Sequence, residues 1–360
     1  MKPVRLLSAA EQVAAHLRDE VLRGGLGERL PGVHQLAAEL GVNHKTVAGA
    51  IRLLEKECLL EPQGTGRSRR VLSPRGFKPP ALRVGILAVE PADCGLNYMV
   101  ELRHELAEAG HTVFFAPKFL YDLRMDVRRV SRVVDRNPAD AWLVLGGSRE
   151  LLEWFAARGS PVFALFGRRR GLPIASAGPD KSTALVEAMH DLARLGHRRI
   201  VLLTRRMRRV PVPGAFEQAF LDELTRHGID PSPYHLPDWE ENIDGFHALL
   251  EELFRVTPPT ALIVDEVPFF LAVRQFLAER GMRVPRDVSM ICTDASPDFE
   301  WCRPRISHIR WDSRPLVRRV VRWISNVAGG REDRKHTFTP AEFVRGETIG
   351  PAGQRRGTSV

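Results

Sequence analysis

The sequence predicts a multidomain protein, with a small α+β winged helix–turn–helix head followed by a larger α/β body of two lobes. Two short amphipathic helices and a basic, glycine-containing hairpin are expected between residues 33 and 71. From residue 84 onward, short apolar runs alternate with helical patterns, which indicates parallel sheets covered on both faces. The segment SPRGFKPP (73–80) disfavours regular structure. We therefore divide the chain into a head (1–72), a linker (73–82), a body (83–328) and a tail (329–360).

A first helix is expected over residues 9–22, because its apolar residues recur at helical spacing. Ser8 and Glu11 have the spacing of a capping box, in which each side chain binds the backbone N–H of the other. Gly24 and Gly25 end the pattern. This helix would complete a three-helix core.

The next two helices form a helix–turn–helix pattern. Their apolar positions are Val33, Leu36, Ala37 and Leu40 in one helix and Val47, Ala50, Ile51 and Leu54 in the other. Gly41 tolerates positive φ and can end the first helix, and Asn43 can cap the second. The residues expected to point outward from the second helix are His44, Lys45, Ala48 and Gly49, which suit a helix in a DNA major groove.

A small hairpin is expected after these helices, with strands near residues 59–62 and 69–71 and the tip Gln63-Gly64-Thr65-Gly66-Arg67. Glycines and arginines at such a tip allow a close, charge-neutralising approach to a phosphate backbone. A plain helical hairpin would not require this wing, so the combination indicates a DNA-binding head.

The head resembles the DNA-binding domain of GntR-type transcription regulators. The matching residues are Leu30-Pro31, Leu36-Ala37, Leu40-Gly41-Val42, Thr46-Val47, Ala50, Leu54-Glu55 and Gly64-Thr65-Gly66. Basic residues of the family fall here on His34, Asn43-His44 and Ala48, so the base preference need not follow the family's usual operators. The resemblance implies DNA contacts from His34, Asn43, His44, Lys45 and Thr46 in the helices and from Arg67, Arg69 and Arg70 in the wing.

The body is predicted to contain alternating strands and helices. We expect strands over 84–89, 113–115, 142–145, 162–166, 200–203, 261–264 and 288–291, and helices over 98–109, 183–195, 216–227, 244–254 and 269–280. The body has roughly 240 residues, which is more than a single hydrophobic core usually organises, so two lobes are favoured. In the tail, residues 341–349 are expected to add a short strand, and the last residues are expected to be disordered.

The body resembles the ligand-binding domain of LacI/GalR-type regulators. The shared motifs are LGHRRI (195–200), PPTA (258–261) and G-x-x-VPxDVS (281–289), followed by Asp294. The resemblance implies two lobes like those of periplasmic sugar-binding proteins, a ligand in the cleft between them and a hinge of crossing strands.

The same resemblance implies the ligand contacts, although two family positions differ here. The family's arginine falls on Val212, and its Asn-Asp pair falls on Glu266-Val267, next to Asp265. The candidate ligand residues are therefore Asp265, Glu266, Phe269, Asp294, Trp301 and Arg208. Asp294 could instead be a structural residue of the hinge. The differences leave open an effector other than the usual sugar, or a body that only dimerises.

Composition agrees with an anionic partner, since the formal net charge is +9 and the isoelectric point is near 9.9. The cysteines Cys58, Cys94, Cys292 and Cys302 form no CxxC motif, so we expect neither disulfides nor a metal site. No cofactor motif and no catalytic motif such as GxSxG, HExxH or a Walker loop occurs. No apolar run is long enough to span a membrane, no signal-peptide core is present, and a soluble cytoplasmic protein is expected.

The sequence thus predicts a DNA-binding transcription regulator rather than an enzyme. We expect a repressor that binds an inverted-repeat operator as a homodimer, with an affinity set by a small effector, a carbohydrate being one candidate. An enzyme with a DNA-binding head and a non-regulatory DNA-binding structural protein are the alternatives.

Overall fold

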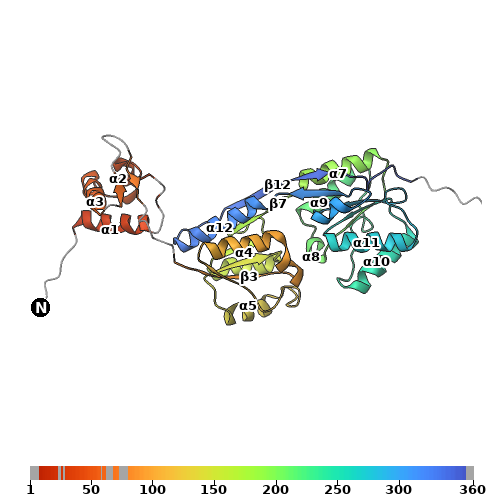
Figure 1. Cartoon of the computed structure of the whole chain (residues 1–360), viewed down its shortest axis with the longest axis horizontal. Coiled ribbons are helices and arrows are strands. Elements are labelled where there is room, and N and C mark those ends of the chain that lie inside the picture. Colours follow the sequence, from red (N-terminus) through yellow and green to blue (C-terminus); the bar gives the residue numbers. More distant parts are fainter. Residues whose placement is uncertain are drawn as a thin grey trace, which may run out of the picture.

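The computed structural model describes residues 8–22, 26, 29–57, 59–61, 68–72 and 80–353 (Figure 1). The part of the head that it describes contains helices α1 (Ala9–Leu22), α2 (Val33–Leu40) and α3 (His44–Lys56) and strands β1 (Leu60–Glu61) and β2 (Arg70–Val71). β1 and β2 are antiparallel, and an isolated bridge joins Arg29 to Arg70. The predicted winged helix–turn–helix is confirmed. The wing tip, including Arg67, lies outside the described residues.

The head has its own hydrophobic core, to which every helix contributes. Leu17 of α1, Leu36 of α2 and Ile51 and Leu54 of α3 are almost completely buried, together with Leu60 of β1. The apolar helix faces expected from the sequence are therefore the faces that pack together in the core of the head.

Three predicted helix ends are also confirmed, whereas Gly24 and Gly25, which we expected to end the first helix, lie outside the described residues. Ser8 and Glu11 form the capping box at the start of α1, with Ser8 N–H donating to Glu11 at 2.8 Å and Glu11 N–H donating to Ser8 at 3.3 Å. Gly41 ends α2 with a left-handed φ of 64°. The Asn43 side chain accepts a hydrogen bond from the backbone N–H of Lys45 at 2.9 Å, which fixes the start of α3.

Within residues 80–353, ten strands form one sheet in the order β4-β3-β5-β6-β7-β12-β11-β10-β9-β8. Strands β3 to β7 belong to the first lobe, and strands β8 to β11 belong to the second. Their bounds are β3 (Arg83–Leu87), β4 (Thr112–Phe115), β5 (Ala141–Leu145), β6 (Val162–Leu165), β7 (Ala175–Asp180), β8 (Ile200–Leu203), β9 (Ala261–Val264), β10 (Ser289–Cys292), β11 (Ser307–Trp311) and β12 (His336–Val344). Each predicted strand of the body overlaps one of these, whereas β7 and β11 were not predicted.

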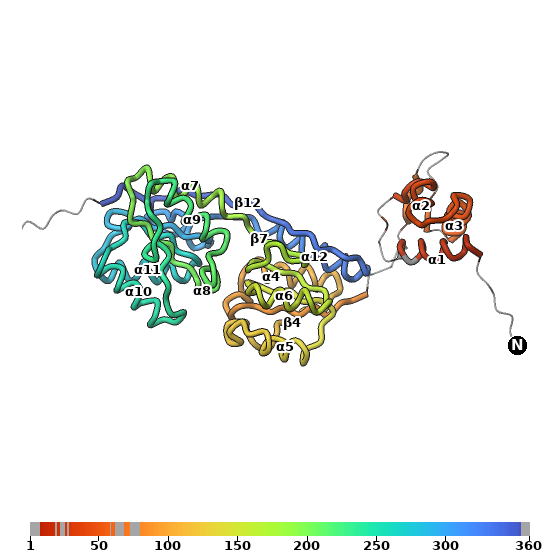
Figure 2. Tube along the Cα trace, turned by 180° about the vertical axis from the view of Figure 1, so that it is seen from behind, coloured from red at the N-terminus to blue at the C-terminus, as the bar shows by residue number. Residues whose placement is uncertain are grey.

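Helices cover both faces of each lobe (Figures 1 and 2). In the first lobe, α4 and α12 pack on one face and α5 and α6 on the other; in the second, α7 and α9 oppose α10 and α11. Their bounds are α4 (Asn97–Glu108), α5 (Val127–Arg136), α6 (Arg149–Arg158), α7 (Ser182–Arg194), α9 (Ala215–Arg226), α10 (Ile243–Val256), α11 (Val267–Glu279) and α12 (Arg314–Ala328). The short helix α8 (Arg206–Arg209) and the 3₁₀ turns η1 (Pro91–Gly95) and η2 (Pro297–Trp301) follow strands of the two lobes.

Strand β12 joins the two lobes. Residues 336–340 pair in parallel with β7, and residues 341–344 pair antiparallel with β11. The strand that we expected at 341–349 in the tail therefore begins five residues earlier and lies in the middle of the sheet. Residues of the tail up to Val344 are part of the body's sheet.

None of the helices in the described ranges has both the length and the apolar character needed to span a bilayer.

Candidate functional site

The start of α3 presents the polar residues expected to meet DNA. Asn43, His44 and Lys45 are exposed and Thr46 is half-buried. The exposed His34 of α2 lies beside them, with its ring centroid 5.7 Å from that of His44. Five residues that can donate or accept hydrogen bonds therefore lie around the N-terminus of α3, and a helix N-terminus is the end that attracts phosphate.

Gly49 corrects one detail of the prediction. We expected it to point outward, but it faces α1, where an added Cβ would lie 3.2 Å from the Cβ of Ala10. The absence of a side chain at Gly49 thus lets α1 and α3 approach closely, so this glycine has a packing role.

The two described arginines of the wing differ in their environment. Arg70 is exposed in β2. The Nε of Arg69 donates to Glu55 of α3 at 3.0 Å, so this side chain ties the wing to the helix. Of the two, Arg70 is the one whose charge is free to meet a phosphate.

In the body, the candidate ligand residues follow the carboxyl ends of neighbouring strands of the second lobe. Asp265 and Glu266 follow β9, Asp294 follows β10, and Arg208 lies in α8 after β8. In an open parallel sheet this edge is where ligands bind.

Asp265 is the most buried member of this group. It accepts hydrogen bonds from Thr204 at 3.2 Å, Thr293 at 2.5 Å and Arg208 at 2.7 Å, and only 1% of its surface is exposed. Burial alone would raise the pKa of Asp265, but the Arg208 charge and the hydroxyl donors hold it below its ordinary value. Arg208 also pairs with the buried Glu217 at 2.8 Å.

Glu266 is held in a left-handed backbone conformation, with φ of 62°. Both of its carboxylate oxygens accept hydrogen bonds from Arg205 at 2.7 Å. Burial and the neighbouring Asp265 raise the pKa of Glu266 to about 7, against the opposing effect of Arg205. A strained backbone and a carboxyl group with a raised pKa are both common features of binding sites.

Arg205 also bridges the two lobes. Its Nη2 donates to Glu90, which follows β3 in the first lobe, at 2.8 Å. Nearby, Arg168 of the first lobe donates to the carbonyl oxygens of Met207 at 2.8 Å and Val212 at 2.7 Å. Val212 stands where the family has an arginine, and here its carbonyl oxygen accepts a hydrogen bond instead.

Asp294 pairs with Lys181 at 2.5 Å. Lys181 immediately follows β7, where the chain passes from the first lobe to α7 of the second. The pair therefore lies at the hinge, as the structural alternative for Asp294 requires, yet a third of the Asp294 side chain is still exposed.

The two predicted aromatic residues are placed differently. Phe269 is half-buried against Trp239 and Phe246, with ring centroids 5.5 and 5.1 Å away. Trp301, at the end of η2, is 89% exposed, and no ring contact of it is found in the described part of the chain. The structure thus gathers Asp265, Glu266, Arg208 and Asp294, places Phe269 under Arg205 at 5.0 Å, and leaves Trp301 on the surface.

Sequence reasoning missed four residues of this region, Arg205, Lys181, Arg168 and Trp239. Trp239 donates from its indole N–H to the carbonyl oxygen of Thr204 at 3.0 Å. The run of arginines at 205–209 after a predicted strand was the signal that could have indicated Arg205.

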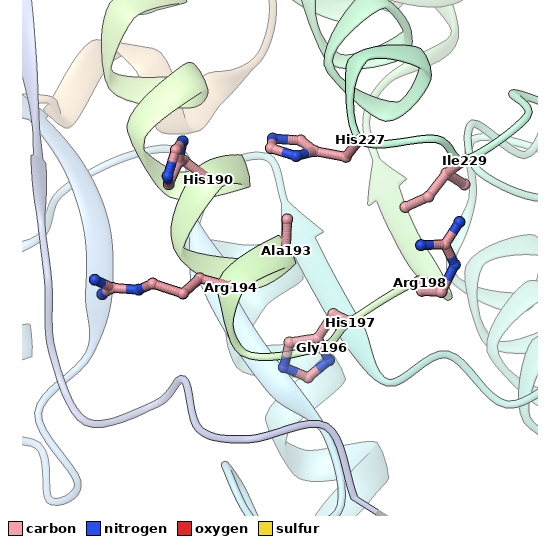
Figure 3. Close-up of a pocket in the computed structure, with 8 residues that line it drawn as sticks. All are labelled: His190, Ala193, Arg194, Gly196, His197, Arg198, His227 and Ile229. Atoms are coloured by element: carbon pink, nitrogen blue, oxygen red, sulfur yellow. The ribbon is translucent and has the colours of Figure 1, made fainter.

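A separate pocket of about 410 Å³ lies where α7 ends and β8 begins, beside the end of α9 (Figure 3). His190 and His227 face each other across it, with Arg194 and Arg198 on either side. His197, also at this pocket, binds Thr260 at 3.0 Å and the carbonyl oxygen of Gly350 at 2.9 Å. Burial lowers the pKa of His197, and its two hydrogen bonds within the lobe indicate a structural role for this histidine.

Among the described residues, no group of three or more histidine, cysteine or acidic side chains is arranged to hold a metal ion. Cys94, Cys292 and Cys302 are free thiols, and burial raises the pKa of Cys94 and Cys292. Cys58 lies outside the described residues.

Comparison with known families finds one match in the head and one in the body. Residues 9–68 match the family described as bacterial regulatory proteins, gntR family, and residues 189–349 match the periplasmic binding protein-like domain. Both predicted resemblances, of the head and of the body, are confirmed by these matches.

Characterised relatives are transcription regulators. The lactose operon repressor of Escherichia coli K12 is 26% identical over 160 residues, which is 44% of this chain and 44% of that repressor. The match thus spans less than half of that repressor's length. The HTH-type transcriptional regulator RafR of Escherichia coli is 28% identical over 235 residues, covering 63% of this chain and 69% of RafR.

Solved structures share the fold of the body. A LacI family transcriptional regulator from Enterococcus faecium with bound ribose superimposes with a TM-score of 0.59 at 17% identity, over 75% of this chain and 99% of that one. The lac repressor dimer bound to operator and an anti-inducer gives a TM-score of 0.59 at 17% identity, over 75% and 95% of the two chains.

Proposed function

Because a GntR-type head precedes a periplasmic-binding-protein-like body in this chain, we propose that the protein is a DNA-binding transcription regulator. In this proposal it acts as a repressor, binds an inverted-repeat operator as a homodimer, and releases or tightens its hold when a small effector enters the cleft.

The observation that carries the proposal is the polar N-terminus of α3. Asn43, His44 and Lys45 are exposed there, while Val47, Ile51 and Leu54 anchor the opposite face of the helix in the core. A helix held in this way can lie in the major groove with its first residues against base edges. A dimer follows from the symmetry of an inverted repeat, since two heads then meet equivalent half-sites.

The effector site is proposed at the carboxyl ends of the second lobe's strands. Asp294 retains an exposed edge that can accept hydroxyl hydrogen bonds, and Arg205 contacts residues of both lobes. A ligand that displaces Arg205 from Glu90 would alter the lobe arrangement, and the coupling to DNA affinity would be about 1–3 kcal/mol. The ribose-bound relative supports a polyhydroxylated ligand as the first class to screen.

The primary experiment is selection of bound sites from random duplex DNA by the full-length protein, followed by gel-shift titration of the recovered sequence at stated salt. We expect a palindromic consensus, and we expect tighter binding to it than to bulk competitor DNA. Equal affinity for the selected and scrambled duplexes would exclude a site-specific regulator. A metabolite screen by thermal shift and release of the operator, with the metabolite recovered unchanged, then distinguishes a regulator from an enzyme.

A second candidate function is a regulator whose body only dimerises. It is favoured by one observation, that the carboxylates Asp265, Glu266 and Asp294 are each already paired with a cation of the chain. Operator binding by a dimer that shows no thermal shift with any metabolite would support it.

A further inference from the structure

Helix α5 of the first lobe carries a stripe of arginines on its outer face. Val130 and Val134 are its buried residues, whereas Arg128, Arg132 and Arg136 are exposed. These three stand at i, i+4 and i+8, on the side of the helix opposite the valines. Figures 1 and 2 show α5 at the outer rim of the lobe, away from the hinge strands.

The arginine stripe, which we define as Arg128, Arg132 and Arg136, is not neutralised by the protein. Within residues 80–353, none of the three forms an ion pair. The acidic residues nearest in sequence have other partners, because Asp126 caps the helix at the N–H of Arg129 and Asp135 pairs with Arg158 at 2.8 Å. The stripe therefore presents an uncompensated charge of +3.

This arrangement differs from an ordinary solvated helix face. On the neighbouring α6, Arg149 is followed at i+4 by Glu153, which accepts from it at 2.6 Å. On α5, like charges occupy the i, i+4 positions, where they repel each other. The stripe spans about 12 Å of helix, a length over which duplex DNA presents roughly seven phosphate charges.

The stripe leads towards the end of the lobe where the head is attached. Shortly after Arg136, the backbone N–H of Asp140 donates to the carbonyl oxygen of Arg83 at 2.8 Å, and the Asp140 carboxylate accepts from the N–H of Arg83 at 2.7 Å. Arg83 opens β3 directly after the linker. Arg136, the last arginine of the stripe, thus lies near the point at which the chain enters the body from the head.

We propose that the arginine stripe of α5 binds the phosphate backbone of duplex DNA that flanks the site held by the head. This inference rests on the proposed DNA-binding function and adds a second contact surface, on the body, that does not read sequence. Such a contact contributes affinity and salt dependence, not base preference.

The test compares full-length wild type with the triple variant Arg128→Gln, Arg132→Gln and Arg136→Gln on two duplexes. One is the selected site alone, of roughly 20 base pairs, and the other carries about 20 further base pairs of unrelated sequence on each side. On the long duplex we expect the variant to bind at least about tenfold more weakly at low salt and its salt slope to fall by up to about 2.7 for each subunit of the dimer, or about 0.9 per lost phosphate contact. On the short duplex the two proteins should bind alike.

Two matched variants make the outcome specific. Arg255→Gln, Arg274→Gln and Arg283→Gln together change the net charge equally, but in the second lobe, and should leave both duplexes unaffected. Lysine at the three stripe positions should restore the slope. Circular dichroism and thermal unfolding check that glutamine leaves α5 folded.

Equal salt slopes for wild type and the stripe variant on the long duplex would overturn the inference. So would an equal loss on the short duplex, because the stripe would then act through net charge. If wild type prefers no duplex at all, the proposed function fails, and the slopes on unrelated long DNA still decide the role of the stripe.

Discussion

At the scale of single residues, each candidate carboxylate at the carboxyl ends of the second lobe's strands is paired with a cation of the chain. Asp265 is paired with Arg208, Glu266 with Arg205, and Asp294 with Lys181. A buried carboxylate without a partner would cost several kcal/mol, so removing the cation of a buried pair should destabilise the unliganded protein. An effector that enters must therefore replace one partner of a pair with a group of similar charge or hydrogen-bonding capacity.

Asp294 is the pair member that remains most open, and its replacement gives the first prediction. Asp294→Ala should abolish the response to a metabolite found by thermal shift, because the acceptor for its hydroxyls is lost. Operator affinity without the metabolite should stay within about twofold, because Asp294 lies in the body and not among the residues of the head that are proposed to meet DNA. Gel shifts with and without the metabolite measure both, and Asp294→Asn should retain part of the response. A response that persists in Asp294→Ala would place the effector elsewhere.

Glu266 predicts a pH effect on stability. Its pKa is raised to about 7 in the folded protein from 4.5, so the folded state binds this proton more tightly than the unfolded chain does. The free energy of unfolding should therefore receive a contribution from Glu266 that is fully present below about pH 4.5 and is lost as the pH rises through about 7.

Urea unfolding between pH 4.5 and 8 tests this effect. Glu266→Gln cannot titrate, so the difference in unfolding free energy between wild type and variant should change across this window. A difference that stays constant with pH would show that Arg205 keeps Glu266 ionised throughout.

At the scale of secondary-structure elements, the sequence was most informative where a pattern is local. The helices of the head and the strands made of apolar runs were predicted because periodicity and caps such as Ser8 and Asn43 act within a few residues. Strand β7 (ASAGPD) contains glycine and proline and has no apolar run, so its strand structure depends on its neighbours β6 and β12. Helix α5 was missed because arginines outnumber the valines that define its buried face.

The family motifs predicted the fold better than they predicted the binding site. His197 of LGHRRI binds Thr260 of PPTA, and Ser289 of the third motif exchanges hydrogen bonds with Gly350. These motifs therefore hold the strands of the second lobe together. The ligand candidates could be placed by the motif frame, but their partners Arg205 and Lys181 could not, because they lie 61 and 113 residues away in sequence.

The wing gives the prediction at this scale. Removing Arg67, Arg69 and Arg70 should weaken binding to every duplex alike and reduce the salt slope, by about 0.9 for each arginine that meets a phosphate. Among single variants, Arg70→Gln should lower the slope at unchanged stability. Arg69→Gln should also destabilise the head, because it leaves Glu55 without its partner. Gel-shift titrations over a range of salt, with thermal unfolding alongside, separate these effects, and an unchanged slope in the triple variant would refute the wing assignment.

At the scale of the whole molecule, two kinds of connection hold the lobes. Strand β12 pairs with β7 of the first lobe and β11 of the second, so the sheet itself is continuous across the hinge. Side chains add contacts beside it, since Arg205 reaches Glu90, Arg168 reaches two carbonyl oxygens of the second lobe, and the Tyr121 hydroxyl donates to the carbonyl oxygen of Glu241. The strand fixes the hinge, whereas the side-chain contacts set how closed the lobes are.

These contacts predict how the lobes open. Hydrogen bonds to charged groups contribute about 1.5–3 kcal/mol each, so the double variant Glu90→Gln and Arg168→Ala should favour separated lobes by more than about one order of magnitude in the equilibrium constant. Small-angle X-ray scattering should then give a larger radius of gyration for the ligand-free variant than for wild type. Arg149→Ala, which removes contacts to Glu153 and Arg170 within the first lobe, provides the control and should leave the scattering curve unchanged. Superimposable curves for wild type and the double variant would mean that β12 and the packed hinge, rather than Arg205 and Arg168, determine the closure of the body.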